Sequence, residues 1–133
     1  MKISSKEKTA LKVMIYLASH YDEKRYISLK EISENEDISL KYLEKIMILL
    51  NKDKKLDVLR GKNGGYKLKY DPKEYTIYDI LKNVEADIDK SPCDKTCIKK
   101  DKCKMLSFYI GLSDNMNKYM NNYTLYDFIT KEE

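Results

Sequence analysis

The chain contains three cysteines, and all three lie within eleven residues. They are Cys93, Cys97 and Cys103, in the run C-D-K-T-C-I-K-K-D-K-C. Thiolates that share one metal centre must lie close together, and a short loop brings them together at little entropic cost. Cysteine binds metal as the thiolate, which the six lysines between positions 90 and 104 favour. The run fits three kinds of site: an iron–sulfur cluster, a zinc ion with one added ligand, and a metal-free thiol redox switch.

The charge of the chain is unevenly distributed. Residues 1–70 carry 16 Lys and Arg against 10 Asp and Glu, whereas residues 71–133 carry 10 against 12. A basic first half is typical of a module that binds phosphate groups. The sequence has one histidine, no Ser/His/Asp or Cys/His set and no glycine loop that would cradle a phosphate. We therefore expect neither an enzyme nor a small-molecule substrate.

Hydropathy gives no sign of a membrane protein. No stretch approaches about 20 apolar residues, and the start M-K-I-S-S-K-E-K is not followed by an apolar segment. We therefore expect no membrane span, no signal peptide and a cytoplasmic location. Thiols stay reduced in the cytoplasm, and an odd number of cysteines argues against a disulfide framework.

Local signals in the first half predict three helices. Ser4 and Glu7 form a capping-box pattern that opens a helix ending near His20. Ser28 and Ser39 are expected to cap two shorter helices. On the buried side of the third helix we expect five apolar residues: Leu40, Leu43, Ile46, Met47 and Leu50. Two short helices joined by a turn, after a longer one, match a helix-turn-helix.

Two short extended runs follow the third helix. They are L-D-V-L-R at 56–60 and Y-K-L-K-Y at 66–70, and G-K-N-G-G lies between them. Three of the four glycines of the chain are in this connection, and glycine supplies the positive φ that hairpin turns need. The sequence therefore predicts a β-hairpin wing, and residues 1–72 are predicted to form a winged helix-turn-helix DNA-binding domain that ends at Pro72.

Residues 73–133 are predicted to form a sensor and dimerisation region. Thr76 and Asp79 cap another short helix, and the cysteine loop occupies 90–104. Apolar residues then recur every three or four positions over about 104–121, which predicts a long amphipathic helix that serves as a dimer seam. The segment Y-T-L-Y-D-F-I at 123–129 repeats Y-T-I-Y-D-I-L at 75–81, which we interpret as one capped-helix solution used twice. The predicted fold is mainly α with a small β-hairpin wing.

Candidate DNA-binding residues lie at three places. In a helix-turn-helix the second helix enters the major groove with its N-terminal residues at the base edges. Lysines there suit phosphates or guanine, tyrosine suits a thymine methyl or a phosphate, and glutamate accepts from a cytosine amino group. Basic residues at a wing tip suit the minor groove, and a helix start suits a phosphate. The predicted contacts are Ser39, Lys41, Tyr42, Glu44, Lys45, Arg60, Lys62, Ser5 and Lys6.

Five segments of the chain resemble one family of proteins. They are M-K-I-S-S-K-E-K-T-A-L, I-S-L-K-Y-L-E-K, V-L-R-G-K-N-G-G-Y-K-L, the cysteine loop and N-N-Y-T-L. Together they resemble the Rrf-two family of bacterial regulators (the IscR, NsrR and CymR type), most of all its IscR-like branch. The resemblance implies a homodimer that binds a roughly palindromic operator in double-stranded DNA. It also implies that Cys93, Cys97 and Cys103 ligate an iron–sulfur cluster, [2Fe-2S] in IscR-like members and [4Fe-4S] in NsrR-like ones.

The chain departs from the IscR pattern at two points. The first pair of cysteines is two residues closer, and Leu106 stands where a histidine ligand is expected. The fourth ligand is therefore open between Glu7 of a second subunit, Asp94, Asp101 and an exogenous thiol or water. From the sequence we expect an iron–sulfur-sensing transcriptional regulator that binds DNA as a homodimer. The alternative is a thiol-redox-responsive or zinc-responsive repressor of the same fold without a cluster.

Overall fold

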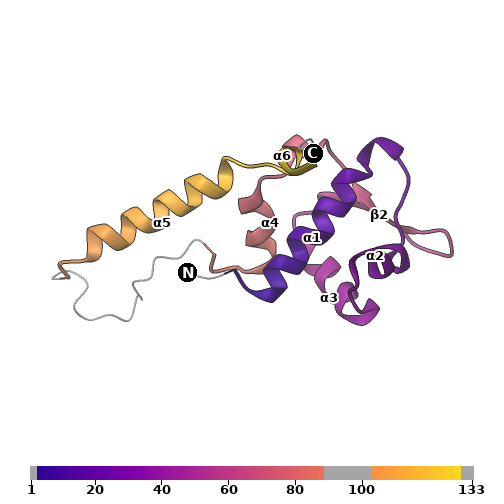
Figure 1. The fold of residues 1–133 in the computed structure, drawn as a ribbon, viewed down its shortest axis with the longest axis horizontal. Coiled ribbons are helices and arrows are strands. Elements are labelled where there is room, and N and C mark those ends of the chain that lie inside the picture. The colour runs from indigo at the N-terminus through magenta and orange to yellow at the C-terminus, as the bar shows by residue number, and fades with distance from the viewer. Residues whose placement is uncertain (1–2, 89–102, 130–133) are drawn as a thin grey trace.

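The computed structural model describes residues 3–88 and 103–129. It is mostly helical, with one two-stranded sheet (Figure 1). In chain order the elements are α1 (Ser5–Ser19), η1 (Tyr21–Glu23), α2 (Leu29–Glu36), α3 (Leu40–Leu50), β1 (Leu56–Leu59), β2 (Gly65–Leu68), η2 (Pro72–Glu74), α4 (Ile77–Val84), α5 (Leu106–Asn121) and α6 (Tyr126–Ile129).

Side-chain caps start the helices of the helix-turn-helix, as the sequence predicts. The hydroxyl of Ser4 accepts from the amide of Glu7, whose carboxylate accepts in return from the amide of Ser4, so the capping box of α1 is complete. The hydroxyls of Ser28 and Ser39 accept from the amides of Glu31 and Tyr42 and so cap α2 and α3. Between α2 and α3 the chain turns at Asp37, which has φ 55° in the left-handed region.

The predicted wing is an antiparallel hairpin of β1 and β2. Its register runs from Leu56 opposite Leu68 to Leu59 opposite Gly65. On its other edge β2 exchanges backbone hydrogen bonds with Ile27, at 2.8 and 2.9 Å. A Cβ at Gly65 would lie 2.2 Å from the carbonyl oxygen of Ile27, so only glycine allows this approach.

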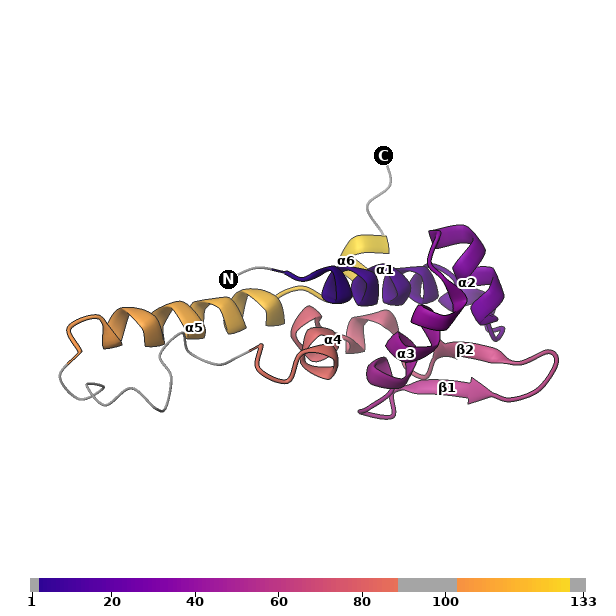
Figure 2. The same ribbon diagram turned by 90° about the horizontal axis from the view of Figure 1, so that it is seen from below.

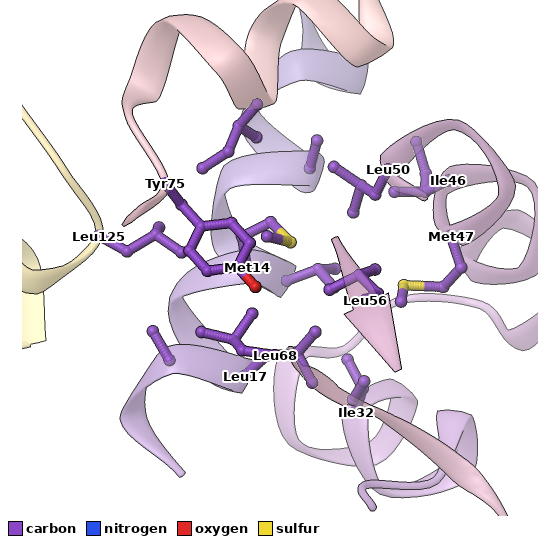
Figure 3. Close-up of a cluster of buried hydrophobic side chains, with 14 of the residues drawn as sticks. Met14, Leu17, Ile32, Ile46, Met47, Leu50, Leu56, Leu68, Tyr75 and Leu125 are labelled. Carbon is purple, nitrogen blue, oxygen red and sulfur yellow. The ribbon is translucent and has the colours of Figure 1, made fainter. Parts of the chain in front are cut away.

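A single apolar core holds α1, α2, α3 and the hairpin together. Its larger members converge from all of these elements in Figure 3, and they include Leu17, Ile32, Met47 and Leu56. Tyr75 and Leu125, from beyond the wing, complete the same core, with exposed fractions of 2% and 0%. The boundary between the two regions at residue 72 stays a prediction.

Helix α5 extends away from the rest of the molecule in both views (Figures 1 and 2). It packs on α4 through a small second cluster in which Met120 meets Leu81 and Ile88. After α5 the chain returns to the core, and α6 lies beside α1. None of the helices in the described residues has the length and hydropathy needed to cross a bilayer.

Candidate nucleic-acid interface and cysteine site

The first turns of α3 present a polar and basic surface. All five predicted contacts of this helix are exposed: Ser39, Lys41, Tyr42, Glu44 and Lys45. The hydroxyl of Ser39 accepts from the amide of Tyr42 at 3.2 Å, so its place in the structure is the N-cap. The helix therefore begins at the point from which base-reading side chains must project.

The prediction that Leu40 is buried is wrong. Its side chain is 46% exposed, whereas Leu43, Ile46, Met47 and Leu50 are buried as predicted. The buried face of α3 begins only at Leu43. The first turn of the helix extends beyond the elements that pack against that face, which leaves Leu40 exposed. An apolar side chain thus stands among the polar residues of the candidate interface.

The wing carries the other predicted basic contacts. Arg60 and Lys62 are both exposed, in the connection between β1 and β2. In Figure 2 the tip of the hairpin extends past α3. The ammonium of Lys67, on β2, lies 4.6 Å from the ring centre of Tyr26, a cation–π contact. Arg60 and Lys62 are the two cationic side chains available at the tip.

Ser5 and Lys6 are exposed in the first turn of α1, as a phosphate contact requires. Figures 1 and 2 place the start of α1 at the end of the helix-turn-helix away from the wing tip. A DNA contact there would be separate from the contacts of α3 and of the wing.

A polar network that the sequence did not reveal fixes α2 against α1. Tyr16 of α1 donates to Glu31 of α2 at 2.7 Å, and Arg25 donates to both oxygens of the same carboxylate at 2.8 and 2.9 Å. The hydrogen bonds from Arg25 lower the pKa of Glu31 to about 2, and burial together with Glu31 raises the pKa of Tyr16 to about 12. His20 lies beside this network and bonds Glu23 at 2.6 Å. The network therefore ties α2 to α1 and to the loop that precedes α2.

Of the predicted metal ligands, Cys103 and Glu7 lie in the described residues, and Cys93, Cys97, Asp94 and Asp101 lie outside them. Cys103 is a half-buried free thiol that precedes α5. Glu7 is 3% exposed; Oε1 accepts from the amide of Ser4, and Oε2 is buried without a hydrogen-bond partner among the described residues. A thiolate and an uncompensated carboxylate oxygen are both suitable ligands for iron, so the donors present fit the predicted site.

Distance separates the two donors within one chain. The starts of α1 and α5 lie far apart in both views (Figures 1 and 2). No group of three or more metal-binding side chains occurs within residues 3–88 and 103–129. The described residues of one chain therefore do not bring Glu7 and Cys103 together in a site with a third metal-binding side chain.

Comparison with known proteins identifies the family. The Rrf2 model, described as "Iron-dependent Transcriptional regulator", matches residues 3–131. The chain belongs to the Rrf2 family. It is 30% identical, over its whole length, to the HTH-type transcriptional regulator IscR of Pectobacterium atrosepticum and to IscR of Escherichia coli K12, and it covers 82% and 83% of those proteins.

Solved Rrf2-type structures have the same fold. The structure of CymR, the global cysteine regulator of B. subtilis, is similar over 100% of this chain and 99% of its own, with a TM-score of 0.82 and 27% identity. T. potens IscR is similar over 97% of this chain and 86% of its own, with a TM-score of 0.74 and 27% identity. The predicted winged helix-turn-helix fold is confirmed. This Rrf2 protein is a DNA-binding transcriptional regulator like IscR, and its relatives are not enzymes.

In this Rrf2 protein α5 leaves large apolar side chains uncovered. Phe108 is 58% exposed, Ile110 47% and Tyr119 65%. Beside α5 lies an open apolar groove of about 660 Å³, whose lining includes Leu11, Ile77, Leu81, Met116, Met120 and Phe128. Exposed apolar side chains and an apolar groove of this kind mark an interaction surface.

Proposed function

We propose that the protein is an iron–sulfur-sensing transcriptional regulator that binds a roughly palindromic operator as a homodimer in the cytoplasm. The observation that carries the proposal is the order of parts along one chain. A basic recognition surface and wing come first, the run of three cysteines follows, and a helix with exposed apolar side chains comes directly after Cys103. Each part supplies one requirement of a signal-dependent DNA-binding protein.

At the DNA, α3 enters the major groove. Lys41 and Lys45 meet phosphates or guanine edges, Tyr42 contacts a thymine methyl or a phosphate, and Glu44 accepts from a cytosine amino group. Glu44 also repels phosphate and so discriminates against wrong sites. Ser39 fixes the start of the helix by capping it.

Further contacts extend this surface. Exposed Leu40 packs against a thymine methyl group in the major groove. Arg60 and Lys62 enter the adjoining minor groove from the wing tip. Ser5 and Lys6 hold a backbone phosphate at the start of α1, where free amide groups favour an anion.

The homodimer forms through α5. The exposed Phe108 and Ile110 of one subunit cover apolar surface of the other, which removes the uncovered ridge and groove from water. This pairing also brings a second copy of Glu7 into the same particle as each cysteine loop, as a ligand from the second subunit requires.

Cys93, Cys97 and Cys103 hold the cluster. Glu7 of the second subunit is the first candidate for the fourth ligand, and Asp94, Asp101 and an exogenous thiol or water are the others. When bound, the cluster supplies a centre that oxidants and iron supply can alter. We expect [2Fe-2S] by resemblance to IscR-like proteins, with [4Fe-4S] as the alternative. The likeness to CymR supports the second candidate function, a regulator that senses through its thiols; one solved relative is Staphylococcus aureus CymR in its oxidized form.

The deciding experiment is an absorbance spectrum of protein purified without oxygen, with iron and acid-labile sulfide assayed on the same sample. Absorption at about 300–500 nm with near-equal iron and sulfide supports a cluster. Zinc without sulfide, or neither metal, supports the alternative. The control is the triple variant Cys93→Ala, Cys97→Ala, Cys103→Ala. If this variant and the cluster-loaded protein bind every operator alike, the sensing proposal is wrong even where a cluster is present.

A further inference from the structure

One buried hydroxyl closes the base of the wing. The side chain of Tyr75 is 2% exposed; its hydroxyl donates to the carbonyl oxygen of Lys55 at 2.7 Å and accepts from the amide of Tyr70 at 3.0 Å. Lys55 precedes β1 and Tyr70 follows β2, so a single side chain joins the two ends of the hairpin. Burial raises the pKa of Tyr75 to about 12, so the hydroxyl remains a donor even in alkaline solution.

The backbone of the same residue is joined to the chain that leaves α5. The amide of Leu125 donates to the carbonyl oxygen of Tyr75 at 3.0 Å, and the amide of Ile77 donates to that of Tyr123 at 2.9 Å. Between these bonds, Thr76 and Thr124 form an antiparallel bridge. Tyr75 therefore has its side chain at the wing and its main chain at the end of α5.

Neighbouring contacts make this joint stiff. The ring of Tyr75 lies in the core beside Leu125 (Figure 3). The ammonium of Lys55 donates to the carbonyl oxygen of Glu74 at 3.0 Å and lies 5.3 Å from the centre of the Tyr75 ring. These contacts leave few freely rotating bonds between the segment after α5 and the wing. A displacement of that segment would therefore move the wing as well.

We propose that Tyr75 is a positioning residue for DNA binding, which holds the wing at the angle where Arg60 meets the DNA and ties that angle to the end of α5. The inference rests on the proposed contact between the wing and the minor groove. Without the hydroxyl, the amide of Tyr70 and the carbonyl oxygen of Lys55 lose their shared partner. The backbone bond from Lys69 to Lys55, at 3.2 Å, remains, so the base of the hairpin loosens without opening while the ring stays in the core.

A double-mutant cycle tests the inference. Operator affinity is measured for the wild type, Arg60→Ala, Tyr75→Phe and the double variant, at one salt concentration. Arg60→Ala should weaken wild-type binding on the order of tenfold, the size expected for losing one arginine contact, and should weaken Tyr75→Phe by only about two- to threefold. The matched control is Tyr16→Phe, which loses a 2.7 Å hydroxyl bond on α1, and there Arg60→Ala should retain its full effect.

The outcomes separate the two proposals. If Arg60→Ala weakens both the wild type and Tyr75→Phe tenfold, Tyr75 has a structural role only and this inference is overturned, whatever the melting temperature does. If Arg60→Ala has no effect in the wild type, the proposed wing contact itself is wrong. Hydrogen exchange on the wild-type dimer needs no variant: operator binding should slow exchange of the Tyr70 amide, and an unchanged rate there would contradict the inference.

Discussion

Replacing Leu40 by alanine tests whether the exposed leucine of α3 reads DNA. Because its side chain is 46% exposed and belongs to no apolar cluster of the described residues, its removal should change the free energy of unfolding by less than about 0.5 kcal/mol. Any larger effect on operator affinity must then come from the contact with DNA.

The partner of this contact can be removed separately. Deoxyuridine lacks only the C5-methyl group of thymidine, and one methyl-sized group buried from water contributes about 0.8 kcal/mol. Replacing the contacted thymidine should therefore raise the Kd of the wild type by about fourfold, since 1.4 kcal/mol corresponds to about a factor of ten. For Leu40→Ala the same replacement should leave the Kd nearly unchanged, because no side chain is left to contact the methyl group.

The assay is fluorescence anisotropy with the preferred operator, first obtained by selection from random duplexes, and with single thymidine-to-deoxyuridine replacements across it. Ile48→Ala is the matched control, since Ile48 is 71% exposed on the same helix but lies near its C-terminal end. It should lose as much affinity on deoxyuridine operators as the wild type does. If Leu40→Ala also keeps the full sensitivity at every thymidine, Leu40 reads no methyl group and the reasoning is refuted.

Three further changes follow from the structure. Glu31→Gln removes a carboxylate whose pKa is about 2 rather than 4.5. The wild type should therefore be more stable than the variant by about 1 kcal/mol above pH 4.5. Urea unfolding should show this difference in stability vanish as the pH falls towards 2. Gly65→Ala places a Cβ 2.2 Å from the carbonyl oxygen of Ile27 and should lower stability by about 2 kcal/mol or more in thermal melting, whereas the control Gly111→Ala, in open space within α5, should raise it by about 0.5–1 kcal/mol. Cys103→Ser should lower the iron and sulfide content of anaerobically purified protein; wild-type content would contradict its role as a ligand.

The sequence predicted those features that depend on residues close together in the chain. The caps at Ser4, Ser28 and Ser39 are local, because a hydroxyl bonds an amide three residues away. The wing was likewise recognisable from its glycines. Leu40 was misplaced for the opposite reason: apolar spacing identifies the face of a helix, but where the core ends along that face depends on the elements packed against it.

Contacts between distant residues left weaker signals. The bond from Tyr16 to Glu31 spans 15 residues and that from Tyr75 to Lys55 spans 20, and no local pattern marks either. The repeat of 75–81 at 123–129 was one weak signal of a contact between distant residues, because the two copies pair with each other at the Thr76–Thr124 bridge. Their caps differ: Thr76 accepts from an amide through its hydroxyl, whereas the amide of Thr124 donates to Asp127.

These ties suggest which part of the DNA interface a signal at the cysteines would reach. Helix α3 is tied to α4 at its far end, where Asn83 donates to the carbonyl oxygen of Leu50 at 3.3 Å, and its base-reading end lies one helix length away. The wing, in contrast, is tied at its base through Tyr75 to the residues that follow α5. A shift of α5 should therefore alter the wing contact before it alters base reading by α3. On this hypothesis, loss of the cluster changes how much Arg60→Ala weakens binding while the bases preferred by α3 stay the same, and a changed base preference with an unchanged Arg60 effect would contradict it.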